Sequence, residues 1–176
     1  APERGAPELF GVTTGLQVPA SKTFALIGGN VLLEGAILKT EGGRIELGSV
    51  AQSGVVSIEA VEKGFSFGFG ELENFGEVQL SQITAVDATG NGAGDVRVTS
   101  KNFTLTDSSV ISSTQTGTEK SAGIVVNTTD SVEINGTNDT FVPSGLYANN
   151  VSNNATEEAG NITINTQQLR VQNGAT

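Results

Sequence analysis

Gly94-Asp95-Val96-Arg97-Val98 carries the pattern that decides the fold: glycine, any residue, aliphatic, any residue, aliphatic. Further copies begin at Gly29, Gly43, Gly54, Gly76 and Gly160, and a copy with alanine in first place begins at Ala122. The period of two puts the aliphatic side chains on one face of a strand, and a glycine before a strand suits a tight turn. Because no long helical pattern separates the copies, the repeat predicts a solenoid of strands.

Three short strands are expected in each coil of the later repeats, which is the arrangement of a parallel β-helix. The chain has 176 residues, enough for about seven short coils. The expected strands are Val31–Leu33, Ala36–Leu38, Ile45–Leu47, Val96–Val98, Phe103–Leu105, Val110–Ile111, Ile124–Val126, Val132–Ile134, Leu146–Ala148, Ile162–Ile164 and Leu169–Val171. The polar insertions between them are expected to form loops on the outside: Thr114–Ser121, Asn135–Ser144 and Asn149–Ala159.

The stretch Gly64–Gly70 has a different texture, with Phe65, Phe67 and Phe69 on one strand face. We interpret these rings as a hydrophobic seam that covers the core where one coil is extended. The alternative is an exposed aromatic platform for a glycan, because sugars stack on such rings.

Composition excludes several classes of function. The sequence contains no cysteine, which removes disulfides, zinc–thiolate sites and thiol catalysis, and no histidine, which removes the commonest general base and metal ligand. Its net charge of −10 argues against nucleic acid or an anionic membrane as a partner. No apolar run approaches the roughly 18–20 residues of a membrane span.

Two strings carry a resemblance to a known family: GGNVLLEGAILKTEGGRIELGSV, residues 28–50, and NFGEVQLS, residues 74–81. These strings resemble the filamentous haemagglutinin-type exoproteins of cyanobacteria, in which such a stretch closes the two-partner-secretion domain. The later strings GDVRV, VEINGT, SGLYAN and GNITINT resemble the shaft repeats of the same family. The resemblance covers residues 9–176. It implies a right-handed, single-stranded parallel β-helix, export through the outer membrane by a partner transporter, and an adhesin or matrix role at the cell surface.

We therefore expect one continuous solenoid with three parts. Residues 1–8 form an irregular lead-in, 9–81 resemble the end of a two-partner-secretion domain, and 82–176 are shaft repeats with polar loop insertions. The Asn-Pro motifs that the family carries early in its secretion domain do not occur in this sequence, so this chain is not expected to direct its own secretion. A start without methionine and a stop directly after a strand pattern indicate a piece of a longer protein.

The polar positions of the repeat carry one group of charged residues that could form a catalytic site. Glu77, Asp95 and Arg97 could lie together on adjacent coils, as a lyase or hydrolase of the β-helix class would require. A solvated face with a weak ion pair is the simpler interpretation. We therefore expect no catalytic residues, no cofactor-binding residues, no metal site and no enzyme activity.

Three weaker patterns are also set aside. Gly92–Val96 lacks the spacing and the neighbouring copies of a calcium-binding repeat. Gly90–Gly94 is not a dinucleotide-binding fingerprint, because no helical pattern follows it. The pair Thr104 and Thr106 does not recur in register, as an ice-binding array would require. Asn-x-Ser/Thr sequons, which permit glycosylation, occur at Asn102, Asn127, Asn135, Asn138, Asn150, Asn154 and Asn161.

The expected function is a stiff shaft of a secreted or cell-surface exoprotein that presents loops to glycans or other surfaces. The alternative is a structural fibre subunit. The strand pattern continues through Leu169 and Val171 almost to the last residue, so strand edges at that end would be unpaired and could associate end to end.

Overall fold

A computed structural model describes residues 18–62, 64–136, 142–152 and 158–176, and throughout these ranges the regular structure is β-strand. None of the described residues belongs to a helix long and apolar enough to cross a membrane. The strands are β1 (Thr23–Gly28), β2 (Val31–Glu34), β3 (Ile37–Lys39), β4 (Arg44–Ser49), β5 (Ser57–Val61), β6 (Gly64–Gly68), β7 (Glu77–Ser81), β8 (Ala85–Asp87), β9 (Asp95–Leu105), β10 (Val110–Ser112), β11 (Gly123–Asn135), β12 (Gly145–Tyr147), β13 (Asn161–Asn165) and β14 (Gln168–Gln172).

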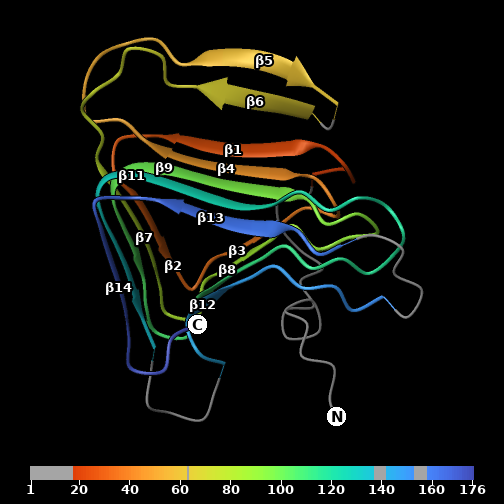
Figure 1. Cartoon of the computed structure of the whole chain (residues 1–176). Helices are drawn as coiled ribbons and strands as arrows, with labels where there is room; N and C mark the ends of the chain where they lie inside the picture. Colours follow the sequence, from red (N-terminus) through yellow and green to blue (C-terminus); the bar gives the residue numbers. More distant parts are fainter. Residues whose placement is uncertain (1–17, 63, 137–141, 153–157) are drawn as a thin grey trace.

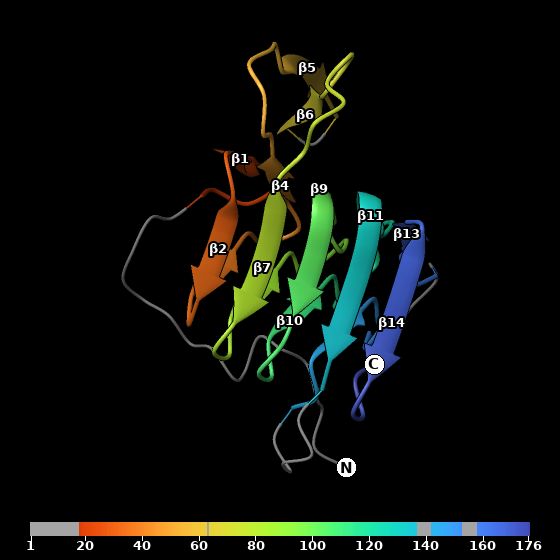
Figure 2. The same ribbon diagram turned by 90° about the vertical axis from the view of Figure 1, so that its left-hand side faces the viewer.

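Parallel pairing gathers all of these strands except β5 and β6 into three stacks that face a common core (Figure 1). The first stack is β1-β4-β9-β11-β13, and the third is β3-β8-β10-β12. The second stack contains β2, β7, the second halves of the long strands β9 and β11, and β14. Figure 2 shows the second stack face on, with its strands side by side and pointing the same way. The expected all-β class with parallel sheets is confirmed.

The chain visits the first, second and third stacks repeatedly in that order, as β1-β2-β3 and again as β9-β10 and β11-β12. Among the described residues the first stack contains five strands, fewer than the expected count of about seven coils. The copies at Gly43, Gly54 and Gly76 all fall within a single passage of the chain, from the residue before β4 to the residue before β7, so one glycine-led copy does not correspond to one coil.

Aliphatic side chains form columns along the stacks. In the first stack the pairing places Phe24, Ile45, Val96, Ile124 and Ile162 in one column, by strand register. Ile45, Val96 and Ile124 are fully buried, so the expected inward direction is confirmed there. Ile162 continues the column but remains 43% exposed, because β11 is its only strand neighbour in the first stack.

The phenylalanine stretch corrects a prediction. It forms an antiparallel hairpin, β5–β6, that lies outside the stacks next to β1 (Figure 1). Phe65 is 51% exposed and no ring of the three belongs to the buried core, so the expected seam over the core is wrong. Phe69 instead covers the outer side of β4, where a Cβ on Gly48 would lie 2.6 Å from its ring.

The insertion Thr114–Ser121 is only partly on the outside. Its middle is exposed, but Gln115 is fully buried. The Gln115 side chain donates hydrogen bonds to the carbonyls of Gly117 (3.1 Å) and Glu119 (2.8 Å), and it accepts one from Ser121 (2.7 Å). A buried turn needs partners for its backbone carbonyls, and a polar side chain at its base supplies them. Residues 1–17, 137–141 and 153–157 lie outside the described ranges, and with them the predicted lead-in and the middle of each of the other two insertions.

Candidate functional site

Four charged side chains meet on the outer face of the first stack. Strand register places Arg44 beside Asp95 and Glu46 beside Arg97. Asp95 and Arg97 were predicted to lie together and do so, with Arg97 Nε 2.8 Å from Asp95 Oδ2. Glu77 does not join them, because it lies in the second stack opposite Asn102. We refer to Arg44, Glu46, Asp95 and Arg97 as the charged cluster.

Arg44 is the centre of the charged cluster. Its Nη2 lies 2.9 Å from Asp95 Oδ2, and its Nη1 donates to Glu46 Oε1 at 3.0 Å. Glu46 and Asp95 are only 3% and 8% exposed. Burial raises the pKa of Glu46, against the opposing effects of the hydrogen bond and charge of Arg44 and the charge of Arg97. Each carboxylate of the cluster therefore contacts at least one arginine, and the cluster as a whole spans the neighbouring strands β4 and β9.

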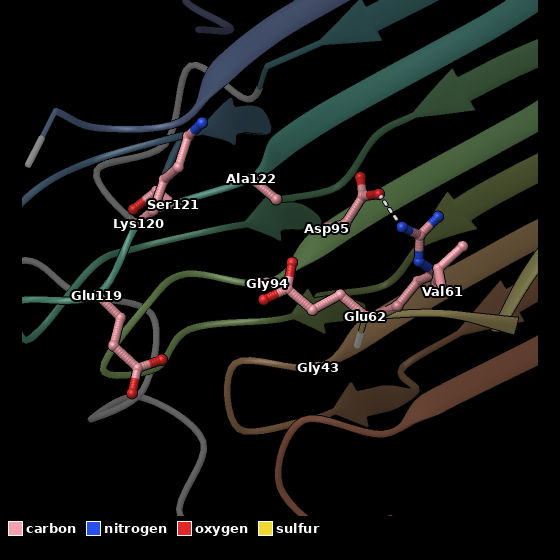
Figure 3. Close-up of a pocket in the computed structure, with 10 residues that line it drawn as sticks. Gly43, Val61, Glu62, Gly94, Asp95, Glu119, Lys120, Ser121 and Ala122 are labelled. Carbon is pink, nitrogen blue, oxygen red and sulfur yellow. Dashed lines mark ion pairs between the residues drawn. The ribbon is translucent and has the colours of Figure 1, made fainter. Parts of the chain in front are cut away.

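A cavity of about 540 Å³ opens beside the charged cluster. Its lining comes from four places: β4 with Arg44, β9 with Asp95, the end of β5 with Glu62, and the approach to β11 with Glu119 and Lys120. Figure 3 shows these side chains around the opening, with the Arg44–Asp95 ion pair marked at its edge. No group of three or more metal-ligating side chains with metal-binding spacing occurs in the described ranges.

The charged groups of this site form ion pairs with one another. General acid–base work needs a carboxyl group with access to a substrate and a pKa suited to its task. Asp95 is held between two arginines and Glu46 is tied to Arg44, so both are engaged within the protein. The Arg44–Asp95 pair joins β4 to β9, whereas the Arg44–Glu46 and Arg97–Asp95 pairs lie within β4 and within β9.

The residues of the calcium-like, threonine and sequon patterns have the following neighbours. Asp95, at the end of the calcium-like string, faces arginines. Thr104 lies between Gln79 and Glu133 in register, so no column of threonines forms there. Among the sequon asparagines, Asn102 accepts a hydrogen bond from Ser131, whereas Asn127 and Asn135 accept from Asn165 and Asn173. Asn138 and Asn154 lie outside the described ranges.

A second candidate site lies at the last two strands, on the side that faces away from β11. We call it the open face of β13 and β14. Ile162, Leu169 and Val171 are 43%, 53% and 49% exposed. Their register partners in β11, which are Ile124, Val132 and Ile134, are at most 2% exposed. The sequence pattern did indicate this open edge, through its strand repeat close to Thr176. It gave no sign of which polar groups line the edge.

Comparison with known proteins gives one match. The family model described as the TPS secretion domain matches residues 5–98, more than half of the chain. The matched range includes β1 to β8, the β5–β6 hairpin and all four residues of the charged cluster. No curated protein and no solved structure matches the chain.

Proposed function

Because the chain belongs to the family of two-partner-secretion (TPS) domains, we infer that it is part of an exoprotein that a cognate outer-membrane transporter exports from the cell. This membership implies a place outside the outer membrane. The family match is the observation that carries the inference, and the all-β fold with parallel stacks agrees with it.

Coexpression with its transporter tests this proposal. The precursor that contains this chain is expressed in a Gram-negative host with and without the cognate transporter, and the culture medium is assayed for the secreted protein. We expect release only when the transporter is present. Equal release in both strains would contradict export by two-partner secretion.

For the shape of the molecule we propose a right-handed, single-stranded parallel β-helix of the filamentous haemagglutinin type, with shaft repeats at 82–176 as in the cyanobacterial exoproteins that the sequence resembles. Repeated visits to the three stacks in one order support the helical path. A crossover between parallel strands of one sheet is right-handed in about 98% of cases, which supports the hand. A crystal structure with a left-handed path would contradict it.

The proposed role is mechanical and adhesive. Parallel backbone pairing runs along the stacks, and polar ladders such as Asn127–Asn165 reinforce it, which gives a stiff shaft for exposed loops. Beads coated with the purified chain are expected to adhere to glycan surfaces or cells. Beads coated with heat-unfolded chain are the control, and equal adhesion of both would contradict a role for the folded shaft.

An enzyme remains the less favoured proposal. The arginine contacts of Glu46 and Asp95 support a structural role for the charged cluster, and a polysaccharide lyase or hydrolase would need carboxyl groups that reach a substrate. Incubation with acidic polysaccharides tests this directly. We expect no release of unsaturated or reducing ends.

As a second candidate function we propose that the chain associates end to end as a structural fibre subunit, through the open face of β13 and β14. The exposure of Ile162, Leu169 and Val171 favours it, because exposed strand edges with apolar side chains pair readily. Light scattering across a concentration series measures the mass. A strictly monomeric chain at high concentration would contradict self-association.

A further inference from the structure

The β5–β6 hairpin has one apolar face and one free edge. Its register places Ile58 opposite Phe67 and Ala60 opposite Phe65, so these four side chains share one face of the ribbon. Ile58 is 63% exposed and Phe65 is 51% exposed. All of β5 is exposed, and no strand of the described ranges pairs with the edge of β5 that faces away from β6. In both views β5 is the outermost strand, with β6 between it and the stacks (Figure 1, Figure 2).

The hydrogen bonds of Phe65 fix which backbone groups lie on the free edge. Its N–H donates to Thr23 Oγ1 (2.8 Å), and its carbonyl accepts from the same hydroxyl (3.1 Å). Both groups therefore point away from β5, so Phe65 and Ala60 form a non-hydrogen-bonded pair of the ladder. Because bonded and non-bonded pairs alternate in an antiparallel ladder, Ala60 and Ile58 direct their N–H and C=O groups outward. A further strand at this edge must bond to these two residues.

The sequence along the free edge is complementary to itself. Residues 55–61 read Val-Val-Ser-Ile-Glu-Ala-Val. Their order of apolar and polar residues is the same in both directions about Ile58. In an antiparallel pair of copies centred on Ile58, Val55 therefore meets Val61 of the second copy. Ser57 meets Glu59 of the second copy, so that a hydroxyl donor faces a carboxylate acceptor.

The two neighbouring registers fit less well. A centre at Glu59 pairs all residues of β5, but it places Glu59 opposite its own copy, and like charges directly opposite each other are destabilising. A centre at Ala60 brings Ile58 opposite Glu62 and so sets an aliphatic side chain against a carboxylate. The centre at Ile58 avoids both conflicts. It also bonds outward-pointing groups to each other, those of Ile58 to its own copy and those of Ala60 to Val56, the residue before β5.

We propose that two copies of the chain join side by side through β5, as an antiparallel pair centred on Ile58. The two hairpins then form one sheet in the order β6-β5-β5-β6, with a continuous apolar face. Each copy contributes the same surface, so the contact closes at a dimer and does not propagate. It uses no residue of β13 or β14 and does not rest on the functions proposed above. The net charge of −10 on each chain opposes the pairing, and added salt should favour it by screening.

Disulfide crosslinking tests the register, because the chain has no cysteine of its own. With Ile58→Cys the two introduced thiols lie opposite each other, and their Cα atoms are about 5.5 Å apart as in a bonded pair, within reach of a disulfide. With Glu59→Cys the two cysteines are diagonal neighbours about 7–8 Å apart, too far for a disulfide without backbone movement. After mild oxidation, non-reducing electrophoresis should show a dimer for Ile58→Cys and its loss for Glu59→Cys.

Sedimentation across a concentration series measures the association itself. It is carried out with Leu169→Glu in every sample, which puts a charge on the open face of β13 and β14 and so removes end-to-end contacts. We expect a monomer–dimer equilibrium that shifts toward the dimer as salt is added. Ile58→Glu sets two carboxylates opposite each other and should abolish the dimer. Leu32→Glu, at an aliphatic residue of the first turn that is 56% exposed, is the matched control and should leave the dimer intact.

Three results would overturn the proposal. They are a chain that stays monomeric at high concentration, a dimer that survives Ile58→Glu, and crosslinking by Glu59→Cys in place of Ile58→Cys. Amide hydrogen exchange in β5 separates a second copy from a strand of the cognate transporter. Protection that rises with the concentration of the chain alone supports the dimer, whereas protection that appears only with the transporter would assign the edge to that partner and overturn the proposal.

Discussion

At the scale of single residues, the absence of a Cβ at particular glycines allows neighbouring turns to approach closely. A Cβ on Gly94 would lie 1.8 Å from the carbonyl oxygen of Gly43 in the neighbouring turn, whereas a Cβ on Gly29 would meet nothing within 4 Å. Gly94→Ala should therefore destabilise the chain by about 2 kcal/mol or more, and Gly29→Ala should stay within about 0.5 kcal/mol of the parent. Chemical unfolding of the two variants checks this. Equal stabilities would contradict the close backbone approach at Gly94.

Glu46 gives a pH-dependent prediction. Because its pKa is raised in the folded chain, the folded state holds a proton that the unfolded state has lost, and stability falls as pH rises from the ordinary value of 4.5 through the raised pKa. Glu46→Gln keeps an acceptor for Arg44 but cannot ionise. The stability of this variant relative to the parent should therefore increase with pH across that window.

Unfolding by denaturant at a series of pH values measures the difference. Arg44, Arg97 and Asp95 face the same carboxyl group, and they are present in both proteins, so the comparison isolates the change at Glu46. Glu77→Gln, at an exposed position in the second stack, is the matched control and should show no such trend. A difference between the Glu46 variant and the parent that shrinks as pH rises would contradict the burial of a charged carboxylate.

The sequence predicted part of the charged cluster. Asp95 and Arg97 were found because both occupy polar positions of one repeat. Arg44 was missed, although it occupies the equivalent place in an earlier copy, because the pattern does not tell which copies share a stack. Glu77 was included for the same reason. A pairing register depends on contacts between distant turns, and a local pattern with period two cannot encode them.

At the scale of strands, position along a column decides what a side chain contributes. Ile124 is fully buried between β9 and β13, whereas its neighbour Ile162 is 43% exposed. Ile124→Ala should cost about 2–5 kcal/mol, and Ile162→Ala no more than about half as much. Thermal and chemical unfolding of the two variants measure the ratio. Equal losses would show that Ile162 is covered in solution, as self-association would require.

The strands themselves were largely predictable, and the hairpin was not. Val31–Leu33, Ile45–Leu47 and Val96–Val98 fall inside β2, β4 and β9 as expected. Alternation in Gly64–Gly70 also predicted a strand correctly. However, an antiparallel hairpin and a parallel stack show the same alternation, and the partner of β6 is decided by a short return from β5. The pattern could therefore not place Phe65 at the surface.

At the scale of the whole molecule, stability should vary along the stacks. β9 and β11 have strand neighbours on both sides, whereas in the described part of the chain β13 and β14 pair with β11 alone. Hydrogen exchange should therefore be slowest in β9 and β11, and faster by about two orders of magnitude in β13 and β14. Mass-resolved exchange of the purified chain measures this order. Uniform protection would instead indicate that the chain opens only by complete unfolding.

The polar ladder between Asn127 and Asn165 also has a consequence for how the gene could lengthen by duplication. Because β11 and β13 carry the same asparagine 38 residues apart, a gene duplication of that 38-residue unit would bring the same side chains into contact again. An insertion one residue longer or shorter inside a strand would turn every following side chain to the wrong face. A duplication of the whole unit would therefore lengthen the protein by one turn with its polar contacts kept, whereas a partial unit would lose them.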